Sequence, residues 1–428
     1  MRVLWFTNTP SNYLQGTNAY NGGGWISSLE SELSKQKDVS LGIAFLLNGQ
    51  AWKVERDGVC YYPISNRFQG LSGKIRGMFL TEDKRNGFYM HEYLKIISDF
   101  KPDIINIFGT EKNYGLIAKY TKIPIVIHIQ GLLIPYFTAY FPPGYNLISY
   151  VCNALNPWKI VKRWHSYDTF RKNAEREKEI FKYNSHFVGR TKWDERLTSI
   201  YSPQATYDYC SEILRNAFYE AAERNIPKRL IIMTTISDPL YKGFDVVLKC
   251  ASLMKCQMGM DFEWKVYGNI QPRFIEEVEG IKSGEVGVRL MGVASPEEIK
   301  KSILNSSVYV HPSYIDNSPN SVCEAQMMGC TVIGQFVGGM PSLIKQGETG
   351  VLVPANDPYQ MACAIRYIYL NPERNIEIAR KAAADAHQRH DKSQIVSDLM
   401  KIYKKYSNKN EFFSKDFPSI PKGKDDIL

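Results

Sequence analysis

Two acidic residues eight positions apart, Asp316 and Glu324, flank a polar segment that is typical of the start of a helix. Residues 317–321 between them supply turn and N-cap residues, with a proline suited to a first helical turn. Residues 322–328 are then predicted to be helical and to end at Gly329. Backbone N–H groups at such a helix start can bind phosphate, and a carboxylate one turn into the helix can accept two hydroxyl hydrogen bonds, as a ribose diol requires. The spacing therefore predicts a nucleotide-sugar site.

The short apolar runs 308–310 and 331–333, on either side of this segment, are typical of buried strands. The order strand, loop, helix, strand puts the ligand side at the carboxyl end of the first strand. Ser318, Asn320 and Ser321 lie at the predicted helix start, so we expect them to contact the nucleotide sugar together with the helix's acidic residue.

This segment resembles the signature of the family 4 glycosyltransferases of the GT-B fold. That signature is Glu-x7-Glu, followed by a Gly-Gly-x-Pro/Glu loop and a Thr-Gly-x-Leu-Val-Pro segment. The matching positions are Asp316, Glu324, Gly329, Gly338, Gly339, Pro341, Gly347, Thr349, Gly350, Leu352, Val353 and Pro354. The resemblance implies that Glu324 binds the nucleotide ribose and that Asp316, one methylene shorter than the family's glutamate, contacts the donor sugar.

Residues 234–245 resemble the family's first strand-to-helix loop of the nucleotide domain, in which an arginine and a lysine neutralise the diphosphate. Lys242, followed by Gly243, matches the lysine, while Ser237 stands at the arginine position. A diphosphate leaving group gains negative charge as the glycosidic bond breaks, so a fixed cation has a catalytic use. The chain contains no Asp-x-Asp. We therefore expect no metal cofactor, and expect Lys242 and helix N-termini to hold the diphosphate.

A run of three glycines that includes Gly23 and Gly24 follows the first predicted strand and opens a helix. Glycines there let the backbone approach a ligand and leave N–H groups free at the helix start. In the family that the chain resembles, this loop lies under the donor phosphates and the acceptor. Both glycines are therefore candidate donor-binding residues.

Residues 123–131 resemble the family strand that ends in a histidine near the reaction centre. Gln130 aligns with that position, and His128 precedes it by two residues on the same strand face. Either residue is a candidate for the catalytic site, and His128 can equally be a hydrogen-bonded core histidine. Residues 189–194 resemble an element of bacterial surface-polysaccharide transferases, which makes Arg190 a candidate cleft residue.

Residues 123–158 contain no Asp, Glu, Lys or Arg, and include an aromatic stretch at 136–141. Prolines argue against a long helix in that stretch. A basic run with Lys159, Lys162 and Arg163 follows it, and this order suits a membrane interface or a lipid-linked acceptor. The alternative is that the aromatic side chains pack into the first domain.

Strand-like and helical runs alternate along the whole chain, which favours parallel sheets with crossover helices. The predicted fold class is α/β, with the GT-B arrangement of two Rossmann-like domains that face each other across a cleft. The predicted boundaries are 1–226 for the acceptor-side domain, 227–392 for the nucleotide-sugar domain and 393–428 for a crossover helix and tail. A helix at 394–406 is the candidate for the return to the first domain.

The chain has 428 residues, 44% hydrophobic and 23% charged, which is enough for two domains with separate cores. A formal charge of +9 suits a nucleotide donor, an anionic membrane or nucleic acid about equally. The eight cysteines include no CxxC pair, which favours reduced thiols and argues against a zinc site. The first apolar run reads as a short strand rather than a signal peptide, and no run of about eighteen apolar residues occurs.

The resemblance implies a retaining hexosyltransferase of surface-polysaccharide synthesis that moves a sugar from a nucleoside diphosphate sugar to a hydroxyl of a glycan or lipid-linked glycan. We expect it in the cytoplasm, peripheral on the inner face of the membrane, with no nucleic-acid partner. One alternative is a GT-B sugar-nucleotide epimerase, which would need acid and base carboxylates in the cleft. The other is a degenerate, non-catalytic GT-B subunit, which is suggested by Asp316 and Ser237 because they replace a glutamate and an arginine of the family pattern.

Overall fold

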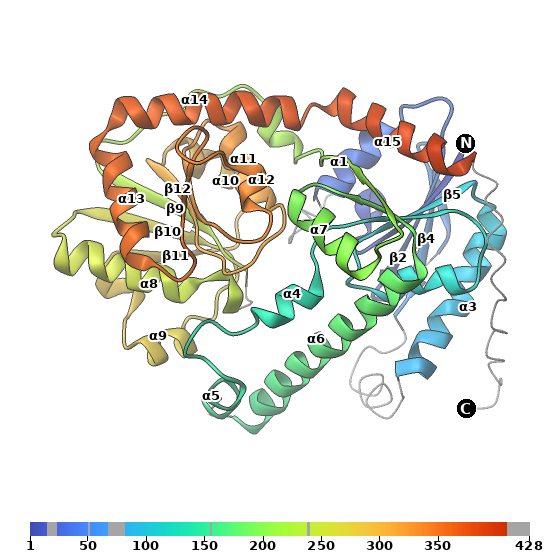
Figure 1. The fold of residues 1–428 in the computed structure, drawn as a ribbon, viewed down its shortest axis with the longest axis horizontal. Coiled ribbons are helices and arrows are strands. Elements are labelled where there is room, and N and C mark those ends of the chain that lie inside the picture. The colour runs from blue at the N-terminus through green and yellow to red at the C-terminus, as the bar shows by residue number, and fades with distance from the viewer. Residues whose placement is uncertain (15–23, 50–51, 67–81, 155, 238–239, 409–428) are drawn as a thin grey trace.

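The computed structural model describes residues 1–14, 24–49, 52–66, 82–154, 156–237 and 240–408. Two α/β domains lie side by side, each built on one sheet, and Figure 1 shows them at the right and left of the molecule. Gly23 lies outside the described residues, so its predicted place in the donor site stays a prediction.

The N-terminal sheet has eight strands in the order β3-β4-β2-β1-β5-β6-β7-β8, all parallel except the edge strand β3. The strands are β1 (Arg2–Thr7), β2 (Ser40–Leu47), β3 (Val54–Arg56), β4 (Val59–Ser65), β5 (Ile104–Phe108), β6 (Ile125–His128), β7 (His186–Gly189) and β8 (Thr206–Tyr209). Along β1, Val3 and Trp5 pack into one core and Leu4 and Phe6 into another. Both faces of the sheet are therefore covered, which explains the continuous apolar run in this strand.

The helices of this domain are α1 (Gly24–Leu33), α3 (Glu82–Phe100), α4 (Leu133–Thr138), α5 (Leu147–Cys152), α6 (Pro157–Tyr183) and α7 (Lys192–Tyr201). The longest, α6, begins where the Asn156 side chain accepts a hydrogen bond from Trp158 N–H, with Pro157 in the first turn. It extends below the sheet together with α4 and α5 (Figure 1).

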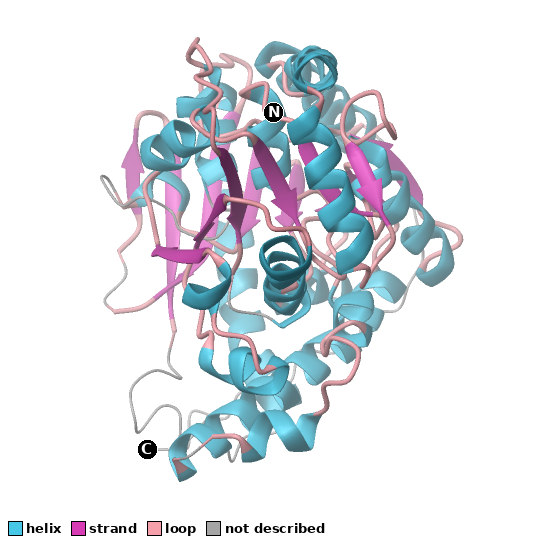
Figure 2. Cartoon of the chain, turned by 90° about the vertical axis from the view of Figure 1, so that its left-hand side faces the viewer, coloured by secondary structure: helices cyan, strands magenta, loops and turns pink. Residues whose placement is uncertain are grey.

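The C-terminal sheet has six parallel strands in the order β11-β10-β9-β12-β13-β14. They are β9 (Leu230–Thr235), β10 (Phe262–Tyr267), β11 (Val288–Gly292), β12 (Val308–His311), β13 (Val332–Gln335) and β14 (Val351–Val353). The helices are α8 (Phe244–Ser252), α9 (Arg273–Glu279), α10 (Pro296–Leu304), α11 (Asn320–Met327), α12 (Met340–Leu343), α13 (Pro358–Leu370) and α14 (Pro372–Arg389). Figure 2 shows strands sandwiched between helices, the arrangement of a doubly wound domain.

The last helix, α15 (Lys392–Ser407), follows α14 but packs on the N-terminal domain. Its buried Tyr403 accepts a hydrogen bond from the indole N–H of Trp5 on β1 at 3.0 Å. The chain therefore passes between the domains twice, once between β8 and β9 and once at His390, which follows α14 (Figure 1).

The aromatic stretch at 136–141 is packed rather than exposed. Tyr136 is buried, and Phe137, Tyr140 and Phe141 form ring contacts with Tyr167 of α6. Of the two interpretations that the sequence left open, the packing of these aromatic side chains into the first domain is confirmed for Phe137, Tyr140 and Phe141. The packing partners of this uncharged stretch are aromatic rings of α6. A sequence analysis that does not identify α6 therefore cannot show that the stretch is packed.

Candidate functional site

The candidate site lies where two neighbouring strands of the C-terminal sheet end. Because β9 and β12 are parallel and paired, the loops that follow them meet at one edge of the sheet. The loop after β9 carries Lys242, and the loop after β12 carries Asp316. Lys242 Nζ lies 2.6 Å from Asp316 Oδ2, and their side chains are only 19% and 8% exposed.

Gly243 makes this close approach of the two loops possible. Its φ of +79° lies in the left-handed region that glycine adopts without strain. A Cβ atom at this position would lie 2.0 Å from the carbonyl oxygen of Pro312, which is inside van der Waals contact. Any other residue would push the lysine loop away from the Asp316 loop.

Three side chains and the backbone N–H of Asn317 contact the Asp316 carboxylate. Besides Lys242, His311 places Nε2 3.1 Å from Asp316 Oδ2, and Tyr136 donates its hydroxyl to Oδ1 at 3.2 Å. Burial raises the pKa of Asp316, but the lysine and His311 outweigh burial and hold that pKa well below its usual range. Asp316 is therefore a buried carboxylate anion.

Tyr136 reaches this carboxylate from α4 of the other domain. Its hydroxyl also accepts a hydrogen bond from the backbone N–H of Asn317 at 3.0 Å. One side chain of the N-terminal domain thus bridges the two residues at the centre of the C-terminal loop. The sequence left open whether the stretch that contains Tyr136 faces a membrane or packs into the first domain, and the structure places Tyr136 in the cleft.

Glu324 lies one turn into α11, as predicted, and is almost fully buried. Arg215, from the segment between β8 and β9, donates from Nε and Nη2 to the two carboxylate oxygens, each at 2.7 Å. Burial raises the pKa of Glu324, and Arg215 offsets part of that shift. Sequence reasoning missed Arg215, because no local motif marks a residue 109 positions away from its partner.

The helix start that carries Glu324 has no side-chain cap. Asn320 and Ser321 form its first turn and are partly exposed, whereas Ser318 is buried and donates its hydroxyl to Glu212 Oε1 at 3.0 Å. The structure thus brings Asn320 and Ser321 to the expected helix start. The hydroxyl of Ser318, which we expected to contact the nucleotide sugar, instead binds Glu212.

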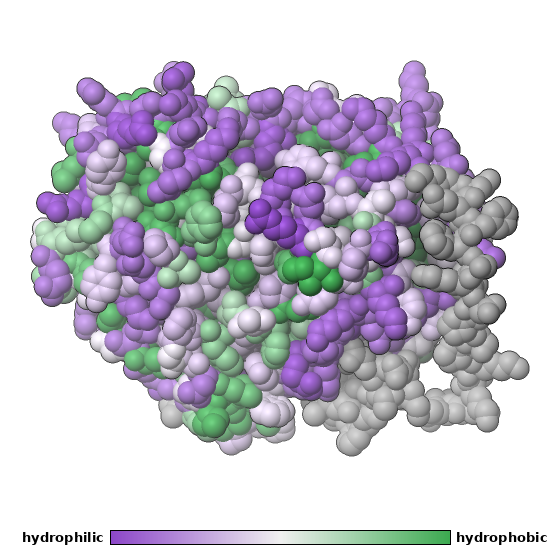
Figure 3. Space-filling view, in the orientation of Figure 1, coloured by the Kyte–Doolittle hydropathy of each residue, from purple (hydrophilic) through white to green (hydrophobic). Residues whose placement is uncertain are grey.

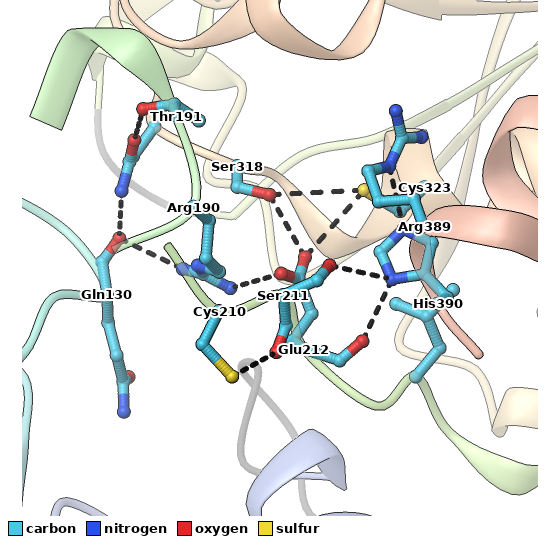
Figure 4. Close-up of polar contacts among 12 residues, drawn as sticks. Gln130, Arg190, Thr191, Cys210, Ser211, Glu212, Ser318, Cys323, Arg389 and His390 are labelled. Carbon is cyan, nitrogen blue, oxygen red and sulfur yellow. Dashed lines mark hydrogen bonds and ion pairs between the residues drawn. The ribbon is translucent and has the colours of Figure 1, made fainter. Parts of the chain in front are cut away.

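Arg190 is buried in the cleft, as the sequence suggested, within the network drawn in Figure 4. Its Nη2 donates to the backbone carbonyl of Gln130 at 3.1 Å, and its Nη1 lies 3.3 Å from Glu212 Oε2. The same carbonyl accepts from the side chain of Asn317 at 3.0 Å. Gln130 therefore joins the domains through its backbone, while its side-chain Nε2 is buried without a hydrogen-bond partner among the described residues.

His128 lies in the interior of the N-terminal domain. Its ring stacks on Phe108 with 5.3 Å between centroids and lies 5.4 Å from the Trp25 ring. Neither ring nitrogen has a hydrogen-bond partner among the described residues, and burial lowers the pKa of His128 to about 3. His128 is therefore a neutral core histidine, without the hydrogen bond that the core interpretation predicted.

Gly24, the one candidate of the glycine run that the structure describes, begins α1. A Cβ atom here would lie 2.8 Å from Cγ of Arg215, so the glycine allows this arginine to pass close to the helix start. An open cavity of about 680 Å³ starts at these two residues and follows α1. The polar residues in its lining include Ser11, Asn12, Ser27, Ser31, Arg56, Tyr61, Asn216 and Glu297.

Glu212, Cys323 and His390 place an oxygen, a sulfur and a nitrogen within 4.8 Å of one another (Figure 4). His390 Nδ1 lies 2.8 Å from the Glu212 carbonyl oxygen, and its Nε2 accepts from Arg389 at 3.2 Å. Burial raises the pKa of the Cys323 thiol to about 12. Because the histidine nitrogens are engaged and the thiol is protonated, this donor set does not fit a metal ion.

Comparison with known proteins concerns the fold and the C-terminal domain. Residues 227–371 match the family model described as "Glycosyl transferases group 1". A sucrose-phosphate synthase structure from Thermosynechococcus elongatus superimposes with a TM-score of 0.70 at 14% identity, over 94% of this chain and 98% of that chain. The Anabaena Alr3699/HepE structure in complex with UDP-glucose superimposes with a TM-score of 0.62 at 13% identity, over 95% and 100%.

The fold is GT-B. The prediction of two Rossmann-like domains facing across a cleft is confirmed, and the match to the group 1 glycosyltransferase model lies within the C-terminal domain. At these identities the structural likeness establishes the fold alone. None of the helices in the described ranges is long and apolar enough to cross a membrane.

Sequence relatives match only parts of this GT-B chain. A D-inositol 3-phosphate glycosyltransferase of Corynebacterium diphtheriae is 36% identical over 81 residues, which is 19% of each chain. A putative colanic acid biosynthesis glycosyltransferase, WcaL, of Salmonella typhimurium is 26% identical over 191 residues, 41% of this chain and 46% of the relative. The matches thus span less than half the length of these curated relatives.

Proposed function

We propose that this protein is a glycosyltransferase that moves a sugar from a nucleoside diphosphate sugar to a hydroxyl of a glycan or lipid-linked glycan. One observation carries the proposal. Lys242, Asp316 and the start of α11 converge at the edge of a sheet in a domain of the group 1 glycosyltransferase type, with Glu324 one turn into the helix. That arrangement offers a cation, a helix N-terminus and a buried carboxylate to a diphosphate and a ribose.

The donor's parts have distinct partners in this proposal. The diphosphate lies against Lys242 and the backbone N–H groups of Asn320 and Ser321 at the uncapped start of α11. The ribose hydroxyls bind Glu324, and the sugar hydroxyls bind Asp316. Lys242 also binds Asp316, so in this proposal the lysine exchanges one anionic partner for another when the donor binds.

The chemical step breaks the bond between the anomeric carbon and the diphosphate oxygen and forms a bond to the acceptor oxygen. The acceptor's proton passes to the leaving diphosphate, and the anomeric configuration is retained. Lys242 stabilises the negative charge that grows on the diphosphate. No metal is required in this proposal, because the lysine and the helix N-terminus hold the diphosphate.

The acceptor is proposed to bind in the polar cavity beside α1. Serine, asparagine and tyrosine side chains line it, and such groups suit the hydroxyls of a sugar chain. Relatives whose names refer to colanic acid and amylovoran biosynthesis favour a polysaccharide or its lipid-linked precursor. We place the protein in the cytoplasm, at the inner face of the membrane where such precursors would be extended.

The test is transfer by the purified chain. UDP-sugars are the first donors to try, because solved structures of similar fold contain UDP, UDP-glucose and UDP-2-fluoro glucose. We expect release of nucleoside diphosphate only when an acceptor glycan is present. Epimerised donor without acceptor would show a sugar-nucleotide epimerase, and no turnover with any donor would favour a non-catalytic subunit.

A further inference from the structure

The start of α6 and the neighbouring α5 expose a group of large apolar side chains. Trp158 is 81% exposed, Val161 52% and Trp164 55% on α6, and Ile148 is 75% exposed on α5. These helices form the lower edge of the molecule in Figure 1, where Figure 3 shows a hydrophobic patch over α5. We call these four residues, with the exposed Lys159 and Lys162, the α5–α6 surface.

Helix geometry separates the two faces of this part of α6. With 3.6 residues per turn, Trp158, Val161, Lys162 and Trp164 fall on the exposed side. On the opposite side, Arg163 stacks on Tyr150 of α5 and donates to its carbonyl. Arg163 thus anchors the inward face to α5, whereas the two tryptophans face outward and are 81% and 55% exposed.

The charged residues on this stretch of the chain are all basic. From Lys112 to Tyr167 the chain contains no Asp or Glu. Two acidic groups on neighbouring parts of the fold have partners of their own: Glu277 of α9 binds Arg273 and Asn153, and Asp168 binds Arg171 and Lys172. Lys159 and Lys162 thus flank the tryptophans with no carboxylate on their own stretch of chain to neutralise them.

We propose that the α5–α6 surface docks this protein onto an anionic lipid bilayer. Tryptophan rings combine an apolar body with a polar N–H and favour the boundary between lipid tails and headgroups. Lysines beside them attract anionic headgroups, each strengthening binding about fivefold, which corresponds to about 1 kcal/mol. The combination of exposed tryptophan and unopposed lysine fits a bilayer better than a protein partner, whose contact surface would need matching carboxylates.

The surface is linked to the candidate site through α4. Helix α4 packs on α6 and carries Tyr136, whose hydroxyl reaches Asp316 in the cleft. The neighbouring ring of Phe137 packs on Tyr167 and Phe170 of α6. This inference rests on the proposed function only in naming a lipid-linked acceptor, whose lipid anchor would lie in the same bilayer.

Co-sedimentation of the full chain with vesicles tests the proposal. The vesicles are phosphatidylcholine alone, or phosphatidylcholine mixed with phosphatidylglycerol. We expect binding to the anionic vesicles that weakens as salt rises, because the Debye length shortens. Lys159→Gln with Lys162→Gln should weaken that binding at least tenfold, and Trp158→Ser with Trp164→Ser should abolish most of it.

Matched variants elsewhere separate a specific surface from general effects. Tyr359→Ser with Tyr367→Ser removes two exposed aromatic rings from α13, where they are 68% and 54% exposed. Lys301→Gln with Lys404→Gln removes two exposed lysines. Both control pairs should bind anionic vesicles like the wild type, and thermal unfolding should show all variants to be folded.

Three results would overturn the proposal: equal binding to neutral and anionic vesicles, wild-type binding by the Trp158/Trp164 variant, or a dimer in solution that this variant dissolves. The last would show that a second copy covers the surface. The outcome is separable from the proposed function, because transfer to a water-soluble acceptor should be unchanged in all of these variants. Vesicle binding, in turn, needs no donor.

Discussion

Replacing Lys242 with Met removes the cation at the site's centre and keeps most of the side chain's volume. The lost contact is a 2.6 Å hydrogen bond between charged groups that are 19% and 8% exposed. Such bonds contribute about 1.5–3 kcal/mol, and breaking a fully buried ion pair costs about 3–5 kcal/mol. Because the lysine is partly solvated and His311 and Tyr136 still contact Asp316, we expect a loss of about 2 kcal/mol in the free energy of unfolding.

The pH dependence of this loss has a definite sign. The folded protein holds the pKa of Asp316 well below its usual range, so the contribution is complete above the unfolded value of about 3.9. It is lost as the pH falls toward the folded pKa. Urea unfolding should therefore show a constant difference between wild type and variant from about pH 8 to about pH 5, shrinking only below about pH 4.

Turnover distinguishes a catalytic lysine from a mere partner of Asp316. Removing a fixed charge from a developing anion lowers turnover about 10²–10³-fold, and it should lower donor affinity less. Lys249→Met is the matched control, because Lys249 also pairs with a buried aspartate, Asp245, at 3.2 Å and is 27% exposed. If Lys242→Met loses stability like this control but retains wild-type turnover, the reasoning is refuted.

Three further predictions concern the same site. Glu324→Ala should weaken the binding of the donor and of free nucleoside diphosphate by the same factor, because both ligands carry the ribose. Each lost charge-assisted hydrogen bond costs about 1.5–3 kcal/mol of binding free energy. If calorimetry shows unchanged diphosphate affinity in a folded variant, Glu324 does not belong to the nucleotide site. Transfer should persist in EDTA, and loss of activity that magnesium restores would show a metal-dependent diphosphate site. Tyr136→Phe should lower the free energy of unfolding by about 1–3 kcal/mol, because the Asp316 carboxylate loses the hydrogen bond that Tyr136 donates and the Asn317 N–H loses one of its two acceptors. A thermal stability equal to that of the control Tyr359→Phe would contradict the cleft contact.

The sequence was most informative where the chain itself sets the geometry. The alternation of strands and helices predicted both parallel sheets, because a crossover helix between parallel strands leaves a local pattern. Asp316, Lys242 and Glu324 were singled out by their motifs, but the direct pairing of Asp316 with Lys242 was not foreseen. That pairing depends on β9 and β12 being neighbours in the sheet, which spacing along the chain does not show.

The residues that sequence reasoning missed or misplaced act between distant segments. Arg215 belongs to the site only because it binds Glu324, and Tyr136 only because it binds Asp316, which lies 180 positions away in the sequence. The long helix α6 was also missed, because its polar and charged residues surround it and leave no amphipathic period. Because α6 was not predicted, the sequence did not show which residues the aromatic side chains of 136–141 pack against.

The two passages of the chain between the domains meet at His390. Its ring contacts the carbonyl of Glu212 at 2.8 Å, and its own carbonyl accepts from Tyr219 at 2.8 Å, so the β8–β9 segment and the α14–α15 junction are joined at one point. Two attachments that coincide permit rotation about that point and oppose sliding. We therefore expect the domains to rotate about the His390 contacts. Such an opening would break hydrogen bonds across the cleft, among them those from Tyr136 to Asp316 and from Asn317 to Gln130.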